Sequence, residues 1–268
     1  METVIPQRPF GLDRNYNDSY PNRPAGPEAL RRVAHSRAGT HDNGSGIANQ
    51  RPPLFCGISQ LDYAAIFAGA RVRKFSRGEM LHNQGDSVQR ILLITSGLVK
   101  ISQIGQHGAE VIFGLDVAGD VLGAEGLFTT GNHSTRAQAF RDCQAFAWEI
   151  PNIKARSDCF PVVQQNAFRI LDGYRVELQQ RFLELATERV GPRVARQLLR
   201  LMEKIGRPVG GAVEIGLSRE DIALMTGTTL FTVSRLFSSW RRLGLVKLRR
   251  ESVTVCDVKQ LFALSEEC

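Results

Sequence analysis

Two short helices joined by a tight turn are predicted within residues 218–243, and this pair constrains the fold more than any other feature. Ser218 and Asp221 have the spacing of a capping box at the start of the first helix, and Gly227 provides the turn. Thr228 is expected to cap the second helix. The apolar residues of that helix recur on one side: Val233, Leu236, Phe237, Trp240 and Leu243.

The other side of the second helix carries hydrogen-bond donors and almost no acid. These residues are Thr229, Thr232, Ser234, Arg235, Ser238, Arg241 and Arg242. A helix that is apolar on one side and rich in donors on the other, held by a second capped helix, suits the major groove of DNA. An ordinary pair of surface helices in an α-helical domain is the alternative.

Positive charge is concentrated around this helix pair. Residues 188–250 contain 13 Lys and Arg against five Asp and Glu, whereas residues 54–187 contain 13 of each. The surplus accounts for nearly all of the net charge of +7 and is the pattern expected of a phosphate-binding face. Residues 245–255 alternate like a β-hairpin with residues 249–252 at its tip, so the sequence predicts a winged helix.

Short apolar runs separated by glycine predict β-structure between residues 72 and 150. Strand-like stretches cover residues 91–95, 98–104, 111–115 and 137–150. Many short strands with glycine turns indicate a small antiparallel roll, which can enclose a small ligand. A short helix is predicted before the roll, through Leu61, Ala65 and Phe67.

A long helix is predicted from residue 160 to about residue 186. Five of its residues form a heptad-like seam with spacings of 4, 3, 4 and 7: Ala167, Leu171, Tyr174, Leu178 and Leu185. The seam predicts a homodimer, with packing inside the chain as the alternative. Arg181 takes the missing seam position, so the stripe is expected to shift to Phe182 there. Gly191-Pro192 is expected to break the helix and act as a hinge before an amphipathic helix at residues 193–205.

These signals predict an α+β chain with four parts. They are a disordered leader (1–52), a cupin-like antiparallel β-roll for an effector (53–158), a dimerisation helix (159–188) and a winged helix-turn-helix domain (189–268). The sequence has neither an apolar run long enough to span a membrane nor a secretory signal. The five scattered cysteines form no CxxC motif and favour a reducing compartment, so we expect the protein in the cytoplasm.

The order of these parts resembles the CRP/FNR family of bacterial transcription regulators over roughly residues 54–260. Besides the helix-turn-helix, the resemblance rests on FSRGEMLHNQGD (75–86), ITSGLVKIS (94–102), GDVLGAEGLF (119–128) and STRAQAF (134–140). It implies a homodimer that binds a near-palindromic promoter site in double-stranded DNA and recruits or blocks RNA polymerase. It also implies that effector state in a cyclic-nucleotide-binding-like roll is relayed through the dimer helix to the recognition helices.

The effector loop departs from the cyclic-AMP-binding members of that family. Those members carry a Glu for the ribose hydroxyl and an Arg-Ser pair for the phosphate, where this chain has Ala124 and Ser134-Thr135. Since each hydrogen bond to a charged group contributes ~1.5–3 kcal/mol, cyclic AMP is not expected as the effector. The possible effector pocket comprises Gly123, Ala124, Glu125, Ser134, Thr135 and Arg136, with Glu125 and Arg136 out of register.

Other cofactors are not expected either. The leader lacks the clustered cysteines of the oxygen-sensing branch, which argues against an iron–sulfur cluster, and lone histidines such as His82, His107 and His133 are weak evidence for haem. A metal-dependent cupin enzyme, the alternative from another class, would need a His-x-His pair with a nearby Glu on one strand, and the sequence has none. We assign no catalytic or metal-binding residue. An effector-independent DNA-binding repressor is a further alternative.

The recognition helix also departs from the family. An Arg-Glu or Val-Glu pair usually precedes the Thr, and here Leu230-Phe231 takes its place. The expected base-reading residues are Leu230, Phe231, Thr232, Ser234 and Arg235, with Arg235 on guanine and the apolar pair on a thymine methyl. The half-site should therefore differ from the TGTGA and TTGAT types. The expected phosphate contacts are Ser218, Arg219, Thr229, Arg249 and Arg250.

Overall fold

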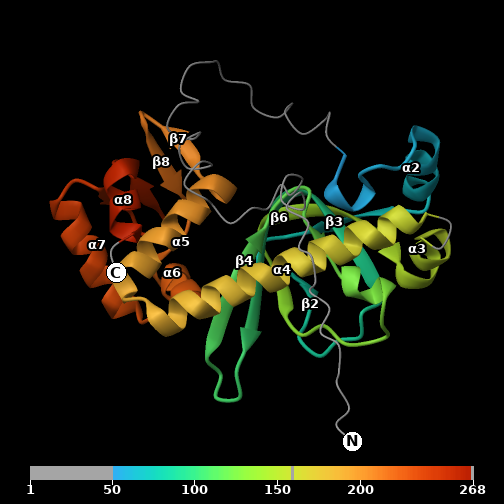
Figure 1. Ribbon diagram of the computed structural model, residues 1–268, viewed down its shortest axis with the longest axis horizontal. Coiled ribbons are helices and arrows are strands. Elements are labelled where there is room, and N and C mark those ends of the chain that lie inside the picture. Colours follow the sequence, from blue (N-terminus) through green and yellow to red (C-terminus); the bar gives the residue numbers. More distant parts are fainter. Residues whose placement is uncertain (1–50, 158–159, 267–268) are drawn as a thin grey trace, which may run out of the picture.

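The computed structural model describes residues 51–157 and 160–266, so nearly all of the leader predicted at residues 1–52 lies outside the described residues. The chain forms an antiparallel β-roll, a long helix that runs along it, and a C-terminal domain of helices with a small sheet (Figure 1). The predicted α+β class, with its roll, long helix and winged helix-turn-helix, is confirmed.

The roll contains six strands. They are β1 (Arg71–Phe75), β2 (Met80–His82), β3 (Arg90–Ile104), β4 (Glu110–Asp116), β5 (Val121–Leu122) and β6 (Arg136–Glu149). They pair antiparallel in the order β1-β6-β3-β4, with β2 joined to β6 and β5 to β3. The two strands expected on either side of Gly97 are a single strand, β3, with register shifts there. Gly97 has φ 93°, and a side chain on it would collide with the backbone of Asp142.

Two apolar clusters hold the roll together. One lies in its interior, where Phe75, Leu92 and Leu122 pack against the alanines of β6. The other includes Phe55, Trp148 and Ala167 and joins the roll to the long helix and to four shorter helical segments. These segments are η1 (Pro53–Phe55), α2 (Gln60–Phe67), η2 (Ala124–Leu127) and α3 (Ile150–Ser157).

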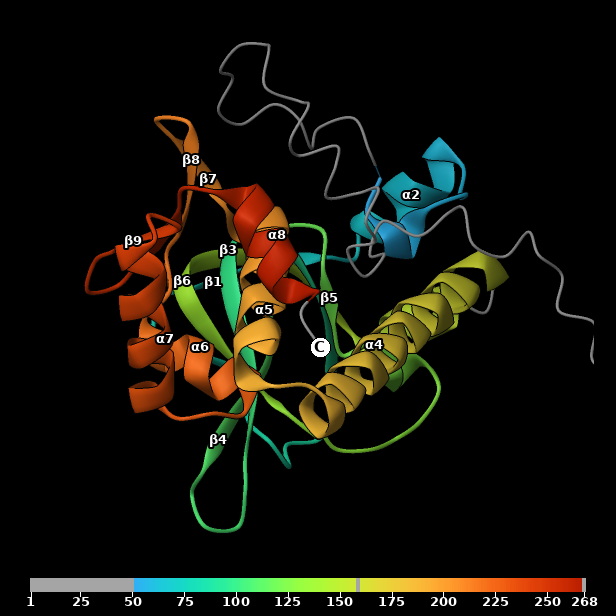
Figure 2. The same ribbon diagram turned by 60° about the vertical axis from the view of Figure 1, so that its left-hand side comes forward.

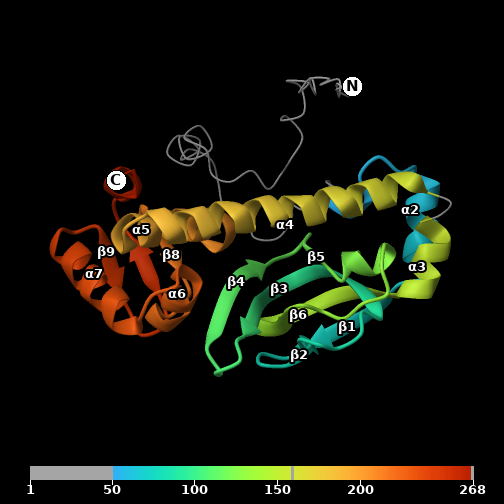
Figure 3. The same ribbon diagram turned by 60° about the horizontal axis from the view of Figure 1, so that its bottom comes forward.

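The long helix α4 (Pro161–Thr187) runs along the roll on the side opposite β1 and β2 (Figure 3). It ends at Glu188, which has extended backbone (φ −104°, ψ 151°), and α5 (Val190–Ile205) starts after the extended Arg189. The prediction of a break at Gly191-Pro192 was therefore wrong by about three residues. Proline fits the first turn of α5 because its missing N–H would have no partner in the helix there.

The C-terminal domain combines α5 with α6 (Arg219–Thr226), α7 (Leu230–Arg242) and α8 (Val258–Ser265). Its strands are β7 (Arg207–Val209), β8 (Ala212–Ile215), β9 (Val246–Leu248) and β10 (Val253–Val255). They pair in the order β7-β8-β10-β9. The predicted two-stranded wing, β9–β10, is thus half of a four-stranded sheet. The sequence analysis missed β7, β8 and α8.

The C-terminal domain packs directly on the roll. Leu98 and Leu115 of the roll belong to the same buried cluster as Phe237 and Trp240 of α7, and α6 contacts β4 (Figure 2). Lys204 of α5 adds a charged contact between the domains, discussed below. None of the helices in the described ranges combines the length and the apolar character needed to cross a membrane.

Candidate nucleic-acid interface

The first helix of the pair starts with the predicted capping box. The Ser218 hydroxyl accepts a hydrogen bond from the Asp221 N–H (3.1 Å), and the Asp221 carboxylate accepts from the Ser218 N–H (2.9 Å). Gly227 ends α6 in the left-handed conformation (φ 58°). The Ser218 hydroxyl also donates to Asp221 (2.6 Å), so its proton is already used within the cap.

The cap of the second helix is Thr229, and the prediction of Thr228 was wrong. Thr229 has extended backbone, and its hydroxyl accepts a hydrogen bond from the Thr232 N–H (3.2 Å). The Thr228 N–H still donates to the Ala223 carbonyl of α6 (3.1 Å), so Thr228 belongs to the preceding turn. A turn one residue longer than expected accounts for the difference.

The apolar side of α7 faces the core. Val233, Phe237 and Trp240 are buried and Leu236 is partly buried, as the spacing predicted. Leu243 was expected on this side but is 65% exposed, because α7 ends at Arg242 and Leu243 is its C-cap.

The predicted base-reading residues lie in the first turns of α7. Phe231 is 74% and Leu230 48% exposed, and Arg235 is also exposed. The Arg235 guanidinium lies over the Phe231 ring, 6.0 Å from its centroid. Thr232 and Ser234 are half-buried. The first turns of α7 therefore present one guanidinium and two apolar side chains to the solvent, and Arg241 and Arg242 are exposed in its last turn.

The predicted phosphate contacts lie at the helix starts and on the wing. Arg219 opens α6 and is half-buried, and Thr229 precedes α7. Arg249 and Arg250 are exposed in the turn between β9 and β10. The side chain of Arg249 is 82% exposed and lies 3.9 Å from the Glu214 carboxylate, which is a loose contact.

Both domains match known families. Residues 192–264 match the Crp-like helix-turn-helix domain, and residues 72–155 match the cyclic nucleotide-binding domain. The chain belongs to the CRP/FNR family of transcription regulators. Regulators of this family bind DNA through the helix-turn-helix and are generally homodimeric.

Several CRP/FNR proteins are similar to the chain over most of their length. The "CRP-like cAMP-activated global transcriptional regulator" of Mycobacterium tuberculosis is 25% identical over 79% of this chain and 95% of its own. The "Fumarate and nitrate reduction regulatory protein" of Salmonella typhimurium is 24% identical over 88% of this chain and 94% of its own. The structure of FixK2 from Bradyrhizobium japonicum matches with a TM-score of 0.65 and 21% identity. The match covers 74% of this chain and 98% of the FixK2 chain.

CRP/FNR membership makes the protein a regulator and not an enzyme. The cupin-type enzyme named as an alternative above is therefore not supported. In the described ranges, no three His, Cys, Asp or Glu side chains lie together as metal ligands would.

The predicted dimer seam spans two sides of α4. Ala167 is fully buried and Leu171 partly buried against the roll. Burial, and then the carboxylates of Asp116 and Asp120, raise the pKa of Tyr174 well above its ordinary value. These three seam residues pack within the chain, which was the alternative, whereas Leu178 and Leu185 are 44% and 49% exposed.

An exposed apolar stripe lies next to that seam. Arg181 turns toward the roll, where it donates to the Phe113 carbonyl and pairs with Glu177. Phe182 is 72% and Phe168 63% exposed. The exposed apolar residues of α4 are Phe168, Val176, Leu178, Phe182, Leu183 and Leu185.

None of the six residues named for an effector pocket lines the cavity of the roll described below. Gly123 is left-handed (φ 77°) and Ala124 is buried in the core. Glu125 pairs with the Nδ1 atom of His133 (3.2 Å). Arg136 donates to the Ser102 hydroxyl (3.0 Å) and to Glu110 (2.8 Å). Ser134 is exposed and Thr135 half-buried.

A cavity of about 380 Å³ lies in the roll. Residues of β1, β2, β3 and β5 line it, together with Asp86, Ser87, Gln89 and His133. The rings of His82 and His133 stack there, with centroids 3.6 Å apart. The His82 Nε2 atom is buried without a hydrogen-bond partner, and burial is the main cause that lowers the pKa of His82 to about 4. Sequence reasoning treated both histidines as isolated. The pairing of β2 with the start of β6, together with backbone hydrogen bonds between His133 and residues 85 and 86, brings them together.

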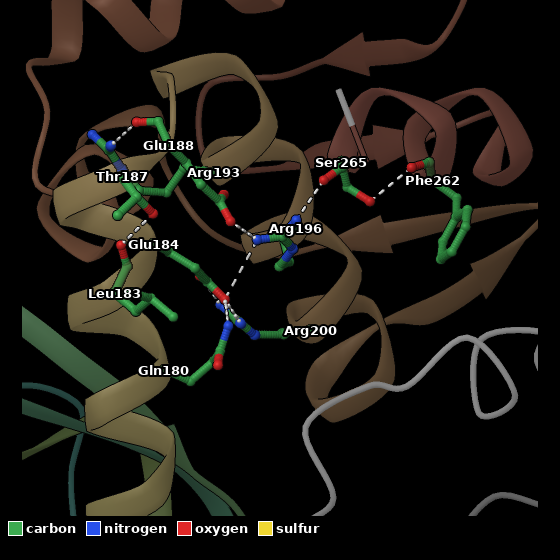
Figure 4. A network of polar contacts seen from close by, with 10 residues as sticks. All are labelled: Gln180, Leu183, Glu184, Thr187, Glu188, Arg193, Arg196, Arg200, Phe262 and Ser265. Carbon is green, nitrogen blue, oxygen red and sulfur yellow. Dashed lines mark hydrogen bonds and ion pairs between the residues drawn. The ribbon is translucent and has the colours of Figure 1, made fainter. Parts of the chain in front are cut away.

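Buried ion pairs anchor the C-terminal domain to α4 (Figure 4). Glu184 is 2% exposed and receives Arg200 of α5 in a two-pronged contact, with Arg196 3.6 Å away. Arg196 also pairs with Glu188 and donates to the Ser265 carbonyl of α8. These contacts join the end of α4 to α5 and, through Arg196, to α8.

Proposed function

We propose that this CRP/FNR regulator binds, as a homodimer, a near-palindromic promoter site whose half-site combines guanine with thymine. The exposed side of α7 carries the proposal, because Leu230, Phe231 and Arg235 project from a helix whose opposite side is buried in the core. A capped helix exposed in this way has the geometry of a recognition helix in the major groove.

Each exposed side chain has a role in this proposal. Arg235 donates two hydrogen bonds to guanine O6 and N7, which is the commonest specific contact to that base. Leu230 and Phe231 contact a thymine methyl, and Thr232 and Ser234 add weaker polar contacts.

The remaining positive charge holds the DNA backbone. Arg219 at the start of α6 and Arg249 and Arg250 on the wing are the proposed phosphate ligands, because Arg219 opens the first helix of the pair and the two wing arginines are exposed. Ser218 and Thr229 lie at the two helix starts and contact phosphate once their capping hydroxyls reorient.

The exposed stripe on α4 supports the homodimer. Phe168, Leu178, Phe182 and Leu185 recur at helical spacing over most of the helix, and a second copy of α4 would bury them in a parallel seam. Such a dimer presents two recognition helices to two half-sites, which explains a near-palindromic target.

The effector is proposed to be a molecule other than cyclic AMP. Ala124 offers no hydrogen bond to a ribose, and Arg136 is already paired with Glu110 and Ser102. An iron–sulfur cluster is not proposed because the leader lacks clustered cysteines, and haem is not proposed because single histidines are weak evidence for it. The family resemblance supports RNA polymerase as the protein partner and the cytoplasm as the compartment.

Selection of DNA from a random pool by the full-length protein tests this function. We expect an enriched near-palindrome with a G·C pair and an adjacent T·A pair in each half-site. The selection is run with and without a small-molecule extract of cells. Equal enrichment in both arms would favour the effector-independent repressor, whereas the absence of any enriched sequence would refute the proposal.

A further inference from the structure

The exposed phenylalanine at the start of α7 needs an explanation that folding does not supply. Phe231 is 74% exposed, although the chain buries other aromatic rings of the same helix, Phe237 and Trp240. A ring left in water gains none of the free energy that favours burial of apolar side chains. The residue therefore contributes little to the core of the domain.

The ring has one distinctive neighbour. Arg235 follows four residues later on the same side of the helix, and its guanidinium lies 6.0 Å from the centre of the ring. The sequence of α7, LFTVSRLFSSWRR, contains no Asp or Glu that could pair with Arg235 from within the helix. The neighbour of the Arg235 guanidinium within α7 is therefore the ring of Phe231 and not a carboxylate.

We propose that Phe231 and Arg235 act as one reading unit. The ring orients the Arg235 guanidinium toward a guanine, while the ring edge contacts the methyl group of the neighbouring thymine. This inference rests on the proposed function, since it requires α7 to lie in the major groove.

Two physical effects favour such a unit. The attraction between a cation and a ring strengthens when water is excluded, as it is between a recognition helix and the bases. A ring that restricts the rotamers of Arg235 before binding also reduces the entropy that this long side chain loses in the complex. Phe231 is in this respect a positioning residue for Arg235.

The same ring changes which base is preferred next to the guanine. A carboxylate at residue 231 would accept a hydrogen bond from cytosine N4, whereas a phenyl ring can make only apolar contact. Thymine is the base that offers a methyl group in the major groove. The pair Phe231–Arg235 therefore predicts a thymine beside the guanine that Arg235 reads.

A double-mutant cycle on the selected DNA site tests the coupling. We compare the wild type, Phe231→Leu, Arg235→Ala and the double variant, because leucine keeps an apolar side chain but removes the ring. Arg235→Ala should weaken binding about 5- to 150-fold in the wild type, and several-fold less in the Phe231→Leu background. Phe231→Tyr keeps the ring and should bind like the wild type.

A second measurement tests the thymine contact. Each thymine of the half-site is replaced in turn by deoxyuridine, which removes only the methyl group. One position, next to the guanine, should lower the affinity of the wild type and leave that of Phe231→Ala unchanged. Leu243→Ala is the matched control, because Leu243 is also an exposed apolar residue of this helix pair but lies at the end of α7.

Additive losses in the cycle, or a half-site with no methyl-sensitive thymine, would overturn the reading unit while wild-type binding stayed sequence-specific. Equal losses on a scrambled duplex would overturn it as well, since the ring would then support binding without reading bases. A wild type with no sequence preference would instead refute the proposed function itself.

Discussion

Glu184 shows how much one side chain contributes to the junction between the two domains. Its carboxylate is 2% exposed at the end of α4, yet it accepts hydrogen bonds from Arg200 and from Gln180. Burial opposes its charge, but Arg200, Gln180 and Arg196 together outweigh this and lower the pKa of Glu184. A buried carboxylate with such partners is costly to lose because its partners stay buried.

Glu184→Gln should destabilise the protein by about 2–4 kcal/mol at neutral pH. Because the folded-state pKa is lowered, this stabilisation is present above the unfolded-state pKa and is lost as pH falls through the folded-state pKa. The thermal midpoint of the wild type should therefore approach that of Glu184→Gln in acid. Glu251→Gln, at an exposed position on the wing, is the control. Equal midpoints of Glu184→Gln and the wild type at pH 7 would contradict this role.

Asp116 behaves in the opposite way. It is buried at the end of β4, with Lys204 of α5 3.6 Å away, while Lys204 lies closer to Asp120 (3.1 Å). Burial raises the pKa of Asp116 to about 7 despite Lys204, and Asp120 and Glu177 add to the increase. An ionised Asp116 is therefore unfavourable in the folded protein.

A raised pKa means that the wild type loses stability as pH rises from about 4 to about 7, and the loss levels off above that. Asp116→Asn mimics the protonated form, so it should remove this loss. We expect similar thermal midpoints for the two proteins below about pH 4 and a higher midpoint for Asp116→Asn at pH 8. A lower midpoint for the variant at pH 8 would show that the ionised carboxylate and Lys204 stabilise the contact instead.

At the scale of elements, the sequence predicted α4 but not which of its sides meets the roll. Ala167 and Tyr174 lie on the heptad seam, yet they pack within the chain, while Phe182 is exposed. A heptad pattern reports only that a helix has apolar sides, and α4 has two of them close together. The sequence alone cannot distinguish the side of α4 that packs on the roll from the side that stays exposed, because the difference depends on contacts with distant strands.

The helix-turn-helix was predictable almost to the residue because its signals are local. The capping box of Ser218 and Asp221 and the left-handed Gly227 act within one or two turns of chain. Strands β7 and β8 form a local hairpin around Gly210-Gly211, a glycine pair that is itself a hairpin signal and was overlooked. By contrast, β8 is held in the sheet by pairing with the distant β10. The His82–His133 stack depends on strand pairing in the same way. Such long-range contacts leave no pattern in a single sequence.

The exposed stripe of α4 gives a prediction at this scale. Phe182→Glu and Leu178→Glu each place two like charges in the proposed seam and should shift the protein from dimer to monomer at micromolar concentration. Sedimentation velocity measures the change. Val72→Glu is the control, because Val72 is 59% exposed on β1, across the roll from α4 (Figure 3). Dimers of unchanged stability in both α4 variants would place the interface elsewhere.

At the scale of the whole molecule, the C-terminal domain is fixed to the roll by three kinds of contact. Leu115 and Leu98 share its apolar core, Lys204 reaches Asp120, and Arg141 of β6 donates a long hydrogen bond to the Gly216 carbonyl (3.5 Å). The sequence predicted the order of the parts. It did not predict this docking, because each contact joins residues that are far apart in the chain.

The contacts of Ala124 and Arg136 in the roll predict no response to cyclic AMP. Ala124 is buried in the core, and Arg136 is paired with Glu110. The six residues named for an effector pocket therefore offer no free guanidinium to a cyclic phosphate. Millimolar cyclic AMP should therefore leave the affinity for the selected DNA site unchanged, and calorimetry should detect no binding. Micromolar binding would mean that Arg136 leaves Glu110 and rebuilds the site.

We expect the exposed side of α7 to read bases and the wing to hold phosphates. This division is tested by the affinities of Arg235→Ala and Arg249→Ala for the selected site and for a scrambled duplex, measured at several salt concentrations. Arg235→Ala should cost ~1–3 kcal/mol on the selected site and little on the scrambled one. Arg249→Ala should weaken both complexes alike and reduce the salt slope by about one. Equal losses of Arg235→Ala on the two duplexes would contradict base reading by α7.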